Sequence, residues 1–156
     1  MATAGISTLG ITLGYAVETS AGTKPSAFTL LERVNSIGGI TMDTEQIDAS
    51  ALEDEVSKYV AGRQDTGGKW SITFNMTNEV VQQLTDMIDA YKATMDNDKQ
   101  MWFEVCSPYL NKAFFVIAQP PLEIPVPEMS QNELQTVEMT LTIVEYKGMD
   151  TKIVPA

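Results

Sequence analysis

The sequence predicts a mainly β protein, an antiparallel β-sandwich or open barrel with one packed α-helix and a long early inter-strand loop. Three observations lead to this fold class. Several segments alternate apolar and polar residues with a period of two, which is typical of half-buried strands. One segment has the apolar period of a helix. The order of strands, one helix and more strands differs from the alternating order of a parallel α/β sheet.

The first forty residues are predicted to form an arm and two strands. Residues 1–9 are small and polar and have the character of an N-terminal arm. Residues 11–17 alternate apolar and polar side chains, which predicts a strand. Residues 19–25 contain Gly, Pro and Ser and predict a turn. Residues 28–34 are rich in β-forming side chains and predict a second strand, which the glycine pair 38–39 ends or bends.

A long polar connector occupies residues 42–68. Ser50 and Glu53 have the spacing of a helix capping box. Three apolar residues could share one face of a short helix, namely Leu52, Val56 and Tyr59. A connector of this length inside a small domain is unusual unless it has a function. The sequence therefore predicts a functional loop with a short helical piece.

The middle of the chain contains the clearest strand and the only convincing helix. Residues 69–77 alternate strictly and predict a strand. Residues 78–93 carry an apolar stripe with helical spacing, and Asn78 is a suitable N-cap residue. We interpret this stripe as the part of the helix that packs on the core.

The last third of the chain is again predicted to be β. Residues 101–106 and 113–119 predict two strands joined by a turn. The prolines at 120, 121, 125 and 127 indicate an extended loop that cannot join a central sheet. Residues 134–146 predict the longest strand, and residues 148–156 a short C-terminal tail.

The composition argues against most kinds of enzyme. The chain contains no histidine, so the commonest general base and metal ligand is missing. The sequence has no nucleophile elbow, phosphate-binding loop or dinucleotide motif. The stretch Asp96–Asp98 begins like a calcium loop, but position six is Met101 instead of glycine. We therefore expect no enzyme, no cofactor and no metal site.

The charge and the apolar pattern restrict the partners. The chain has 21 acidic and 10 basic residues, a net charge of −11. Sequence-independent binding to nucleic acid needs a basic surface, which this balance does not supply. The sequence has no apolar run long enough to span a membrane and no basic N-terminus with an apolar stretch after it, so we expect neither membrane association nor secretion.

One pattern inside the connector carries more information than its composition. It has the form E-x-x-D-x-[ST]-x-L-x-D followed by an aromatic residue and a glycine, and its positions are Glu45, Asp48, Ser50, Leu52, Asp54, Tyr59 and Gly62. This pattern resembles a signature of the major tail tube proteins of long-tailed bacteriophages. The resemblance extends loosely over the whole chain, through the strand at residue 69, one helix, a strand hairpin and a patterned final strand. Ser50 stands where threonine is more usual, which preserves the hydroxyl group.

The resemblance implies a structural protein of the virion tail, assembled in the host cytoplasm. Proteins of this kind form hexameric rings that stack into a hollow tube, through which the DNA passes without specific binding. It also implies that the connector contacts the next ring and that other tail proteins, namely the terminator, the distal tail protein and the tape measure, are partners. The residues expected to stack the rings are Glu45, Asp48, Ser50, Leu52, Asp54, Val56, Tyr59 and Gly62.

If the chain lines such a channel, strands with a hydroxyl-rich face are the candidates for its wall. The candidate residues are Ser71, Thr73, Asn75, Thr136, Glu138, Thr140 and Thr142. An acidic or neutral wall would repel the DNA phosphates and let the duplex slide. An ordinary solvent-facing sheet surface would show the same pattern.

Two other functions remain open at this point. One is a tube protein of a contractile tail, a tailocin or a secretion system. The other is a monomeric acidic β-sandwich that binds a ligand or a protein.

Overall fold

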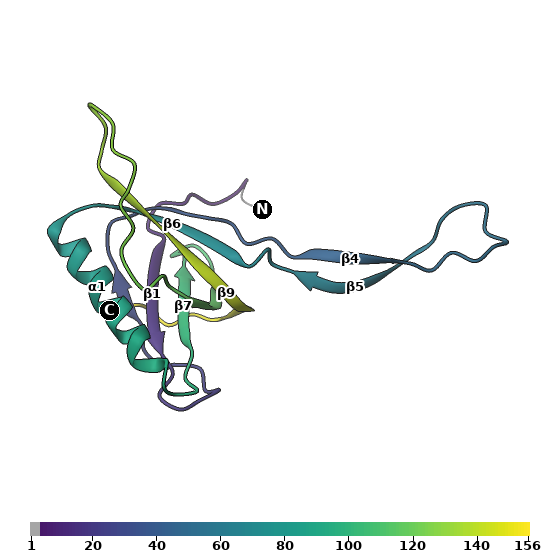
Figure 1. Ribbon diagram of the computed structural model, residues 1–156, viewed down its shortest axis with the longest axis horizontal. Coiled ribbons are helices and arrows are strands. Elements are labelled where there is room, and N and C mark those ends of the chain that lie inside the picture. The colour runs from purple at the N-terminus through teal and green to yellow at the C-terminus, as the bar shows by residue number, and fades with distance from the viewer. Residues whose placement is uncertain (1–3) are drawn as a thin grey trace.

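The computed structural model describes residues 4–156. Within this part of the chain, nine strands and one helix follow one another (Figure 1): β1 Thr12–Val17, β2 Thr29–Leu31, β3 Val34–Ile37, β4 Asp43–Asp48, β5 Tyr59–Asp65, β6 Lys69–Asn75, α1 Asn78–Thr94, β7 Met101–Cys106, β8 Lys112–Gln119 and β9 Thr136–Thr151. Seven strands form an antiparallel sheet in the order β2-β1-β7-β8-β9-β6-β3, while β4 and β5 form a separate two-stranded sheet. The prediction of a mainly β fold with one packed helix is confirmed.

The large sheet is curled into an open barrel, which brings its two edge strands, β2 and β3, close enough to be joined by a short turn. Only Glu32 and Arg33 separate β2 from β3, although these strands lie at opposite edges of the sheet. Arg33 adopts φ 58°, in the left-handed region, which turns the chain between the two edges. The prediction of one strand over residues 28–34 is therefore wrong at its end. The helix holds this corner, since the Gln83 side chain accepts from the Glu32 N–H at 2.9 Å.

Helix α1 lies against the curled sheet (Figure 1), and its apolar stripe belongs to the main core. The buried apolar residues of the helix are Val80, Leu84, Met87 and Ile88. Its N-cap is Thr77, whose hydroxyl accepts from the Val80 N–H at 3.2 Å. The prediction of Asn78 as the cap is wrong by one residue, because the side chain one position earlier reaches the free N–H groups of the first turn.

The main core lies inside the curl. Neighbouring residues on β6 and β9 bury the same face of the sheet, with Trp70 opposite Leu141 and Phe74 opposite Val137. The Trp70 and Phe103 rings meet edge to face, with centroids 6.0 Å apart. The alternation predicted for both strands is confirmed.

A second, smaller core lies on the outer face of β7 and β8. It consists of Phe28, Trp102, Cys106, Ala113, Phe115 and Ile117. Residues 152–156 cover it: Pro155 is buried, and a Cβ at Gly14 would lie 3.0 Å from its ring. The predicted tail, residues 148–156, is thus too long, because β9 continues to Thr151 and stays paired with β8.

Strand β9 changes partners along its length. Residues 136–142 pair with β6, and residues 142–151 pair with β8. Each half of β9 therefore has one edge without a strand partner among the residues the structure describes. Between residues 4 and 156, no helix is long and apolar enough to cross a membrane.

Candidate functional site

The connector of residues 42–68 forms a hairpin that projects from the body of the protein (Figure 1). Strands β4 and β5 pair antiparallel, with Ile47 opposite Val60 and Asp48 opposite Tyr59. Every residue of β4 is exposed, and all of β5 except Gly62 is exposed. A lone two-stranded hairpin is marginally stable in water, so this element is suited to being covered by a partner.

Side-chain hydrogen bonds organise the end of the hairpin and replace the predicted helical piece. The Asp48 carboxylate accepts from the Ser50 N–H at 2.9 Å, and the Ser50 hydroxyl accepts from the Lys58 N–H at 2.7 Å. The capping box expected at Ser50 and Glu53 is therefore wrong, because the Ser50 oxygen bonds across the loop instead. Hydrogen bonds from the Ser50 side chain and backbone lower the pKa of Asp48.

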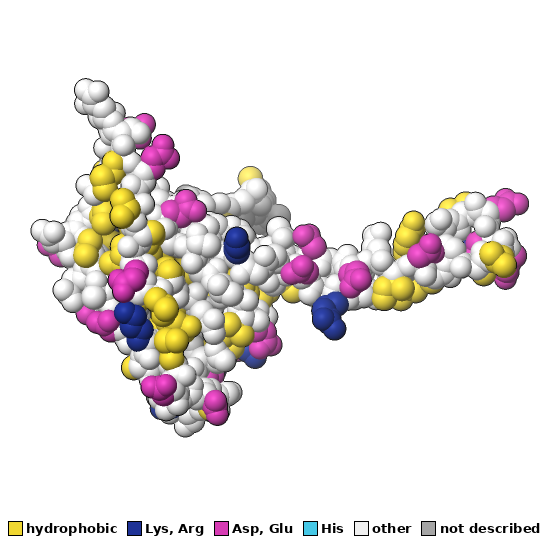
Figure 2. Space-filling model, viewed as in Figure 1, with side chains coloured by type: hydrophobic (Ala, Val, Ile, Leu, Met, Phe, Trp, Pro, Cys, Tyr) yellow, Lys and Arg dark blue, Asp and Glu magenta, His cyan; other side chains and the backbone are white. Residues whose placement is uncertain are grey.

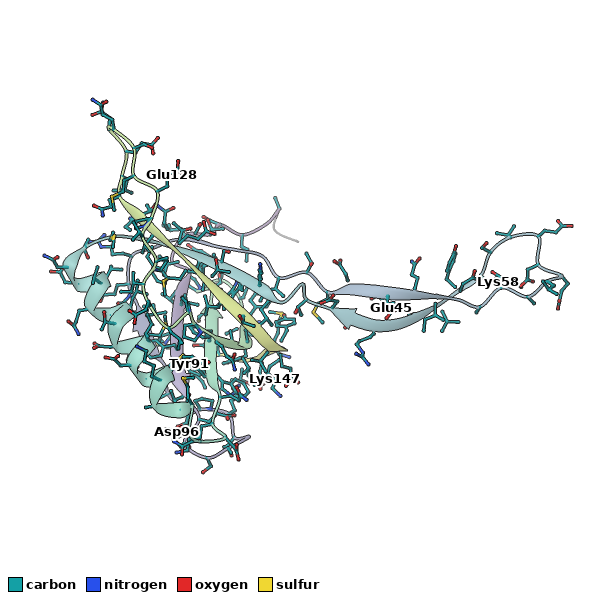
Figure 3. All side chains as sticks on the ribbon, viewed as in Figure 1. Glu45, Lys58, Tyr91, Asp96, Glu128 and Lys147 are labelled. Atoms are coloured by element: carbon teal, nitrogen blue, oxygen red, sulfur yellow. The ribbon has the colours of Figure 1, made fainter. Side chains whose placement is uncertain are left out.

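A third carboxylate closes the loop. Asp54 accepts from the Ala51 N–H at 2.8 Å and forms an ion pair with Lys58 at 3.2 Å. Figure 3 shows Lys58 at the far end of the hairpin and Glu45 along β4, both away from the body. Asp48, Ser50 and Asp54, which the sequence singles out for ring stacking, thus shape the loop.

The apolar residues predicted for stacking lie on the loop and on β5 without contact with the core. Leu52 is 106% exposed, Val56 75% and Tyr59 59%. They do not share a helical face, because the segment is not helical. Two further apolar residues, Ile47 and Val60, are also exposed on the hairpin. Sequence reasoning missed this pair because only strand pairing places residues 47 and 60 side by side.

Glu45 and Gly62 meet at an irregular point of the hairpin. The register shifts between Thr44 and Gln46, so the two strands differ by one residue there. A Cβ at Gly62 would lie 3.2 Å from the Glu45 carbonyl oxygen and 3.2 Å from the Ile47 Cδ1 atom. Glycine at position 62 therefore allows the close approach of β4.

The hairpin is acidic as well as apolar. Between Asp43 and Asp65 the chain has seven acidic residues against Lys58 and Arg63, which leaves a net charge of −5. Acidic and hydrophobic side chains are both visible along the projection in Figure 2. Such a surface favours a partner that is partly apolar and not itself strongly acidic.

The seven residues predicted for a channel wall lie together on one face of β6 and β9. Ser71 is opposite Thr140, Thr73 opposite Glu138, Asn75 opposite Thr136, and Thr142 opposite Lys69. The Ser71 and Thr140 hydroxyl oxygens are 3.3 Å apart. This face points away from the main core, since the alternate residues of both strands are the buried ones.

A second projection rises beside this face. It is the proline-containing segment of residues 120–135, and Glu128 lies on it in Figure 3. Val126, Met129 and Leu134 are exposed there. A groove of about 520 Å³ separates the segment from the hydroxyl-rich face and is lined in part by Thr73 and Glu138.

Two buried carboxylates, those of Glu18 and Glu104, lie on the outer side of the sheet. Both accept hydrogen bonds from N–H groups of the surrounding chain, so we interpret them as structural. Burial alone would raise the pKa of Glu18, but hydrogen bonds from the Trp102 indole and from the Gln100 and Gly22 N–H groups outweigh it and lower the pKa. The Glu104 side chain is 0% exposed, and among residues 4–156 it accepts only from the Ile153 N–H, at 2.8 Å. Burial raises the pKa of Glu104, although that hydrogen bond and the nearby Lys24 and Lys152 oppose the shift.

The raised pKa of Glu104 gives a testable pH dependence. Above the ordinary value of 4.5, the unfolded chain loses this proton before the folded one does. Stability from this group is therefore present at lower pH and is lost as pH rises through the folded pKa. We expect Glu104→Gln to gain stability relative to the unsubstituted protein as pH rises above 4.5, measured as thermal midpoints across a pH series. A difference in thermal midpoint between the two proteins that stays constant from acid to neutral pH would contradict the raised pKa of Glu104.

Comparison with known proteins gives the fold but no family. No protein-family model matches the chain, and no curated protein matches its sequence. A chain in the six-fold symmetrised cryo-EM structure of the anti-feeding prophage baseplate matches with a TM-score of 0.50 and 12% identity, covering 96% of both chains. A chain in the tail of an empty GTA particle, solved with helical refinement and C6 symmetry, matches with a TM-score of 0.52 and 13% identity, covering 81% of this chain and 87% of that one. The protein therefore shares its fold with subunits of tail and baseplate particles.

Proposed function

We propose that this protein is a structural subunit of a virion tail, which forms hexameric rings that stack into a hollow tube for DNA. The observation that carries the proposal is the projecting hairpin, whose exposed apolar side chains nothing in the described chain covers. Exposed apolar patches on a folded protein mark interaction sites. The two structures of the same fold, one six-fold symmetrised and one with C6 symmetry, support a ring of six.

The free edges of β9 support direct contact between subunits. The two halves of β9 leave unpaired edges on opposite sides of the strand. Unpaired edges are templates for pairing with another chain. A closed ring of copies would satisfy both edges at once, whereas a monomer leaves both in water.

The hydroxyl-rich face of β6 and β9 is proposed to line the channel. DNA carries one phosphate for about every 1.7 Å of its axis, so a basic wall would bind it strongly. The seven residues of this face contribute hydroxyl and amide groups and one carboxylate, Glu138. A neutral to acidic wall lets the duplex pass without specific binding.

Within this proposal, the partners are further copies of the chain and the other tail proteins, namely the terminator, the distal tail protein and the tape measure. The protein is located in the virion tail after assembly in the host cytoplasm. A tube protein of a contractile tail, a tailocin or a secretion system is the second candidate. The two matched chains belong to a baseplate and to a tail, so both candidates are compatible with the shared fold.

Negative-stain electron microscopy of the purified protein, with light scattering over a range of concentrations, tests the proposal. Tubes or stacked rings with six-fold end views are the expected result. Particles that remain monomeric at every concentration would refute the proposal and favour an acidic β-sandwich that binds a ligand or protein. Gene neighbours that encode a sheath would favour the second candidate.

A charge reversal on the channel face gives a functional prediction. Glu138→Lys should slow DNA ejection, because six added lysines in a ring would bind the phosphates. The matched control is Glu79→Lys, an equal change of charge on the exposed face of α1. Both variants should fold and assemble, and their ejection times are compared at low and high salt. Equal ejection by the two variants would show that Glu138 does not line the channel.

A further inference from the structure

An open apolar cavity lies at the root of the hairpin. It has a volume of about 280 Å³ and is lined by Ile37, Ile40, Trp70, Val105, Phe114 and Tyr146, with Gly38 and Gly39 at its side. The cavity lies next to the C-terminal half of β9, the part of that strand that has left β6. A cavity of about 150 Å³ already accepts a benzene-sized group, so this one has room for one or two aliphatic side chains.

The same chain carries an apolar side chain that touches none of its described neighbours. Leu52, at the end of the hairpin, is fully exposed although the loop around it is ordered by the bonds of Asp48, Ser50 and Asp54. Burial of a leucine side chain contributes about 1.5–3 kcal/mol, which folding of the single chain does not gain here.

A chain cannot place its own Leu52 in its own cavity. Twelve residues lead from Ile40 to Leu52, most of them in or next to the extended strand β4, so the two sites are separated by up to about 40 Å. The hairpin would have to fold back on itself, which would break the pairing of β4 with β5. A contact of Leu52 with this cavity is therefore one between copies, and such a head-to-tail contact repeats without closing unless a rotation closes it.

The charge beside the cavity is opposite to the charge at the end of the hairpin, which favours this contact. Lys112 lies on the same face of β8 as the cavity residue Phe114, two positions away. Lys112 forms no ion pair among residues 4–156, and the nearby Asp150 is already paired with Lys24 at 3.0 Å. Leu52 is followed directly by Glu53, Asp54 and Glu55. The acidic end of the hairpin would thus reach the cavity beside an available lysine.

We infer that the cavity at the hairpin root is the seat for Leu52 of a second copy of this chain, which belongs to the neighbouring ring of the stack. This inference rests on the proposed function and names the surface on which the hairpin of the neighbouring subunit binds. Each copy then offers a tip on one side and a seat on the other, and one heterologous contact repeats along the tube.

Disulfide trapping tests the seat directly. Leu52→Cys and Ile40→Cys are combined with Cys106→Ala, which removes the native thiol. A disulfide needs Cα atoms within about 7 Å, so it forms only if the tip enters the cavity. Oxidation of assembled tubes should give a ladder of covalent multimers. Val126→Cys replaces Leu52→Cys in the control, since Val126 is also apolar and almost fully exposed, at 89%, but lies on the other projection.

Blocking the seat gives a second test that does not depend on cysteine chemistry. A Cβ at Gly39 would meet nothing within 4 Å, so Gly39→Ala is compatible with a folded subunit, and the thermal midpoint of Gly39→Leu checks that the larger side chain is tolerated. Gly39→Leu should raise the protein concentration needed for assembly at least tenfold, and Gly39→Ala should change it little.

The outcomes separate the inference from the function on which it rests. Tubes that assemble but give no ladder, together with normal assembly of Gly39→Leu, would overturn the seat and leave the tube. Unsubstituted protein that forms no tubes would overturn both. A small apolar molecule found in the cavity of assembled protein by mass spectrometry, again without a ladder, would identify a ligand site and overturn the inference.

Discussion

Replacing Leu52 by serine and Tyr59 by threonine is expected to abolish tube assembly while the subunit remains folded. Both side chains are exposed on the hairpin and contact no core residue, so the unfolding free energy should change by less than about 0.5 kcal/mol. Assembly loses two apolar contacts per subunit, repeated six times in each ring. Electron microscopy should show no tubes at concentrations where the unsubstituted protein forms them.

The choice of uncharged replacements removes an ambiguity. An aspartate at position 59 would face Asp48 across the strand pair, and like charges in that position would destabilise the hairpin itself. The control, Leu52→Ile with Tyr59→Phe, preserves apolar surface and should assemble normally. Tubes of ordinary length from the serine–threonine variant would show that the hairpin does not stack the rings.

Replacing Trp70 by alanine is expected to have the largest effect on stability. The indole is buried in the main core beside the cavity at the hairpin root and packs edge to face on Phe103. It also donates a hydrogen bond to the Gly38 carbonyl at 2.7 Å, which ties the hairpin root to the sheet. We expect a loss of about 3–5 kcal/mol, because tryptophan-to-alanine changes in cores leave a cavity and remove apolar contacts.

Urea denaturation followed by circular dichroism measures this loss. Trp70→Phe is the control, since it retains most of the ring packing and loses the hydrogen bond to Gly38, worth about 1 kcal/mol. Equal stability of the alanine variant and the unsubstituted protein would show that the core is not centred on this residue. A phenylalanine variant that folds well but assembles poorly would connect the hydrogen bond at the root to the position of the hairpin.

These two predictions affect different properties because the chain separates folding from assembly. The residues that stabilise the fold belong to the main core or to the smaller core that residues 152–156 cover. The apolar residues proposed to stack the rings lie on the hairpin, where they are exposed and substitution costs little stability. The hairpin residues can therefore be changed without much effect on the core, whereas changes at the cavity wall, which includes Trp70, affect both properties.

The sequence alone determined the elements whose apolar pattern is long and regular. Strand β6 and helix α1 were predicted to within two residues of their ends, because alternation or helical spacing over seven or more residues allows only one buried face. Strand β9 was predicted at its start but continues five residues beyond its predicted end at residue 146. The polar face of β6 and β9 followed from the same alternation. The connector was identified as unusual by its length and its pattern, although its role in stacking is still a prediction.

The tertiary structure alone decided features that depend on distant partners. The turn at Arg33 separates β2 from β3 because the two strands pair at opposite edges of the curled sheet, which residues 28–34 do not encode locally. Residues 50–59 have helical spacing, yet strand pairing of β4 with β5 and the bond from the Lys58 N–H to the Ser50 hydroxyl stabilise a hairpin. The cavity at the root and the burial of Glu104 likewise come from long-range packing, since burial is a property of what the fold places around a residue.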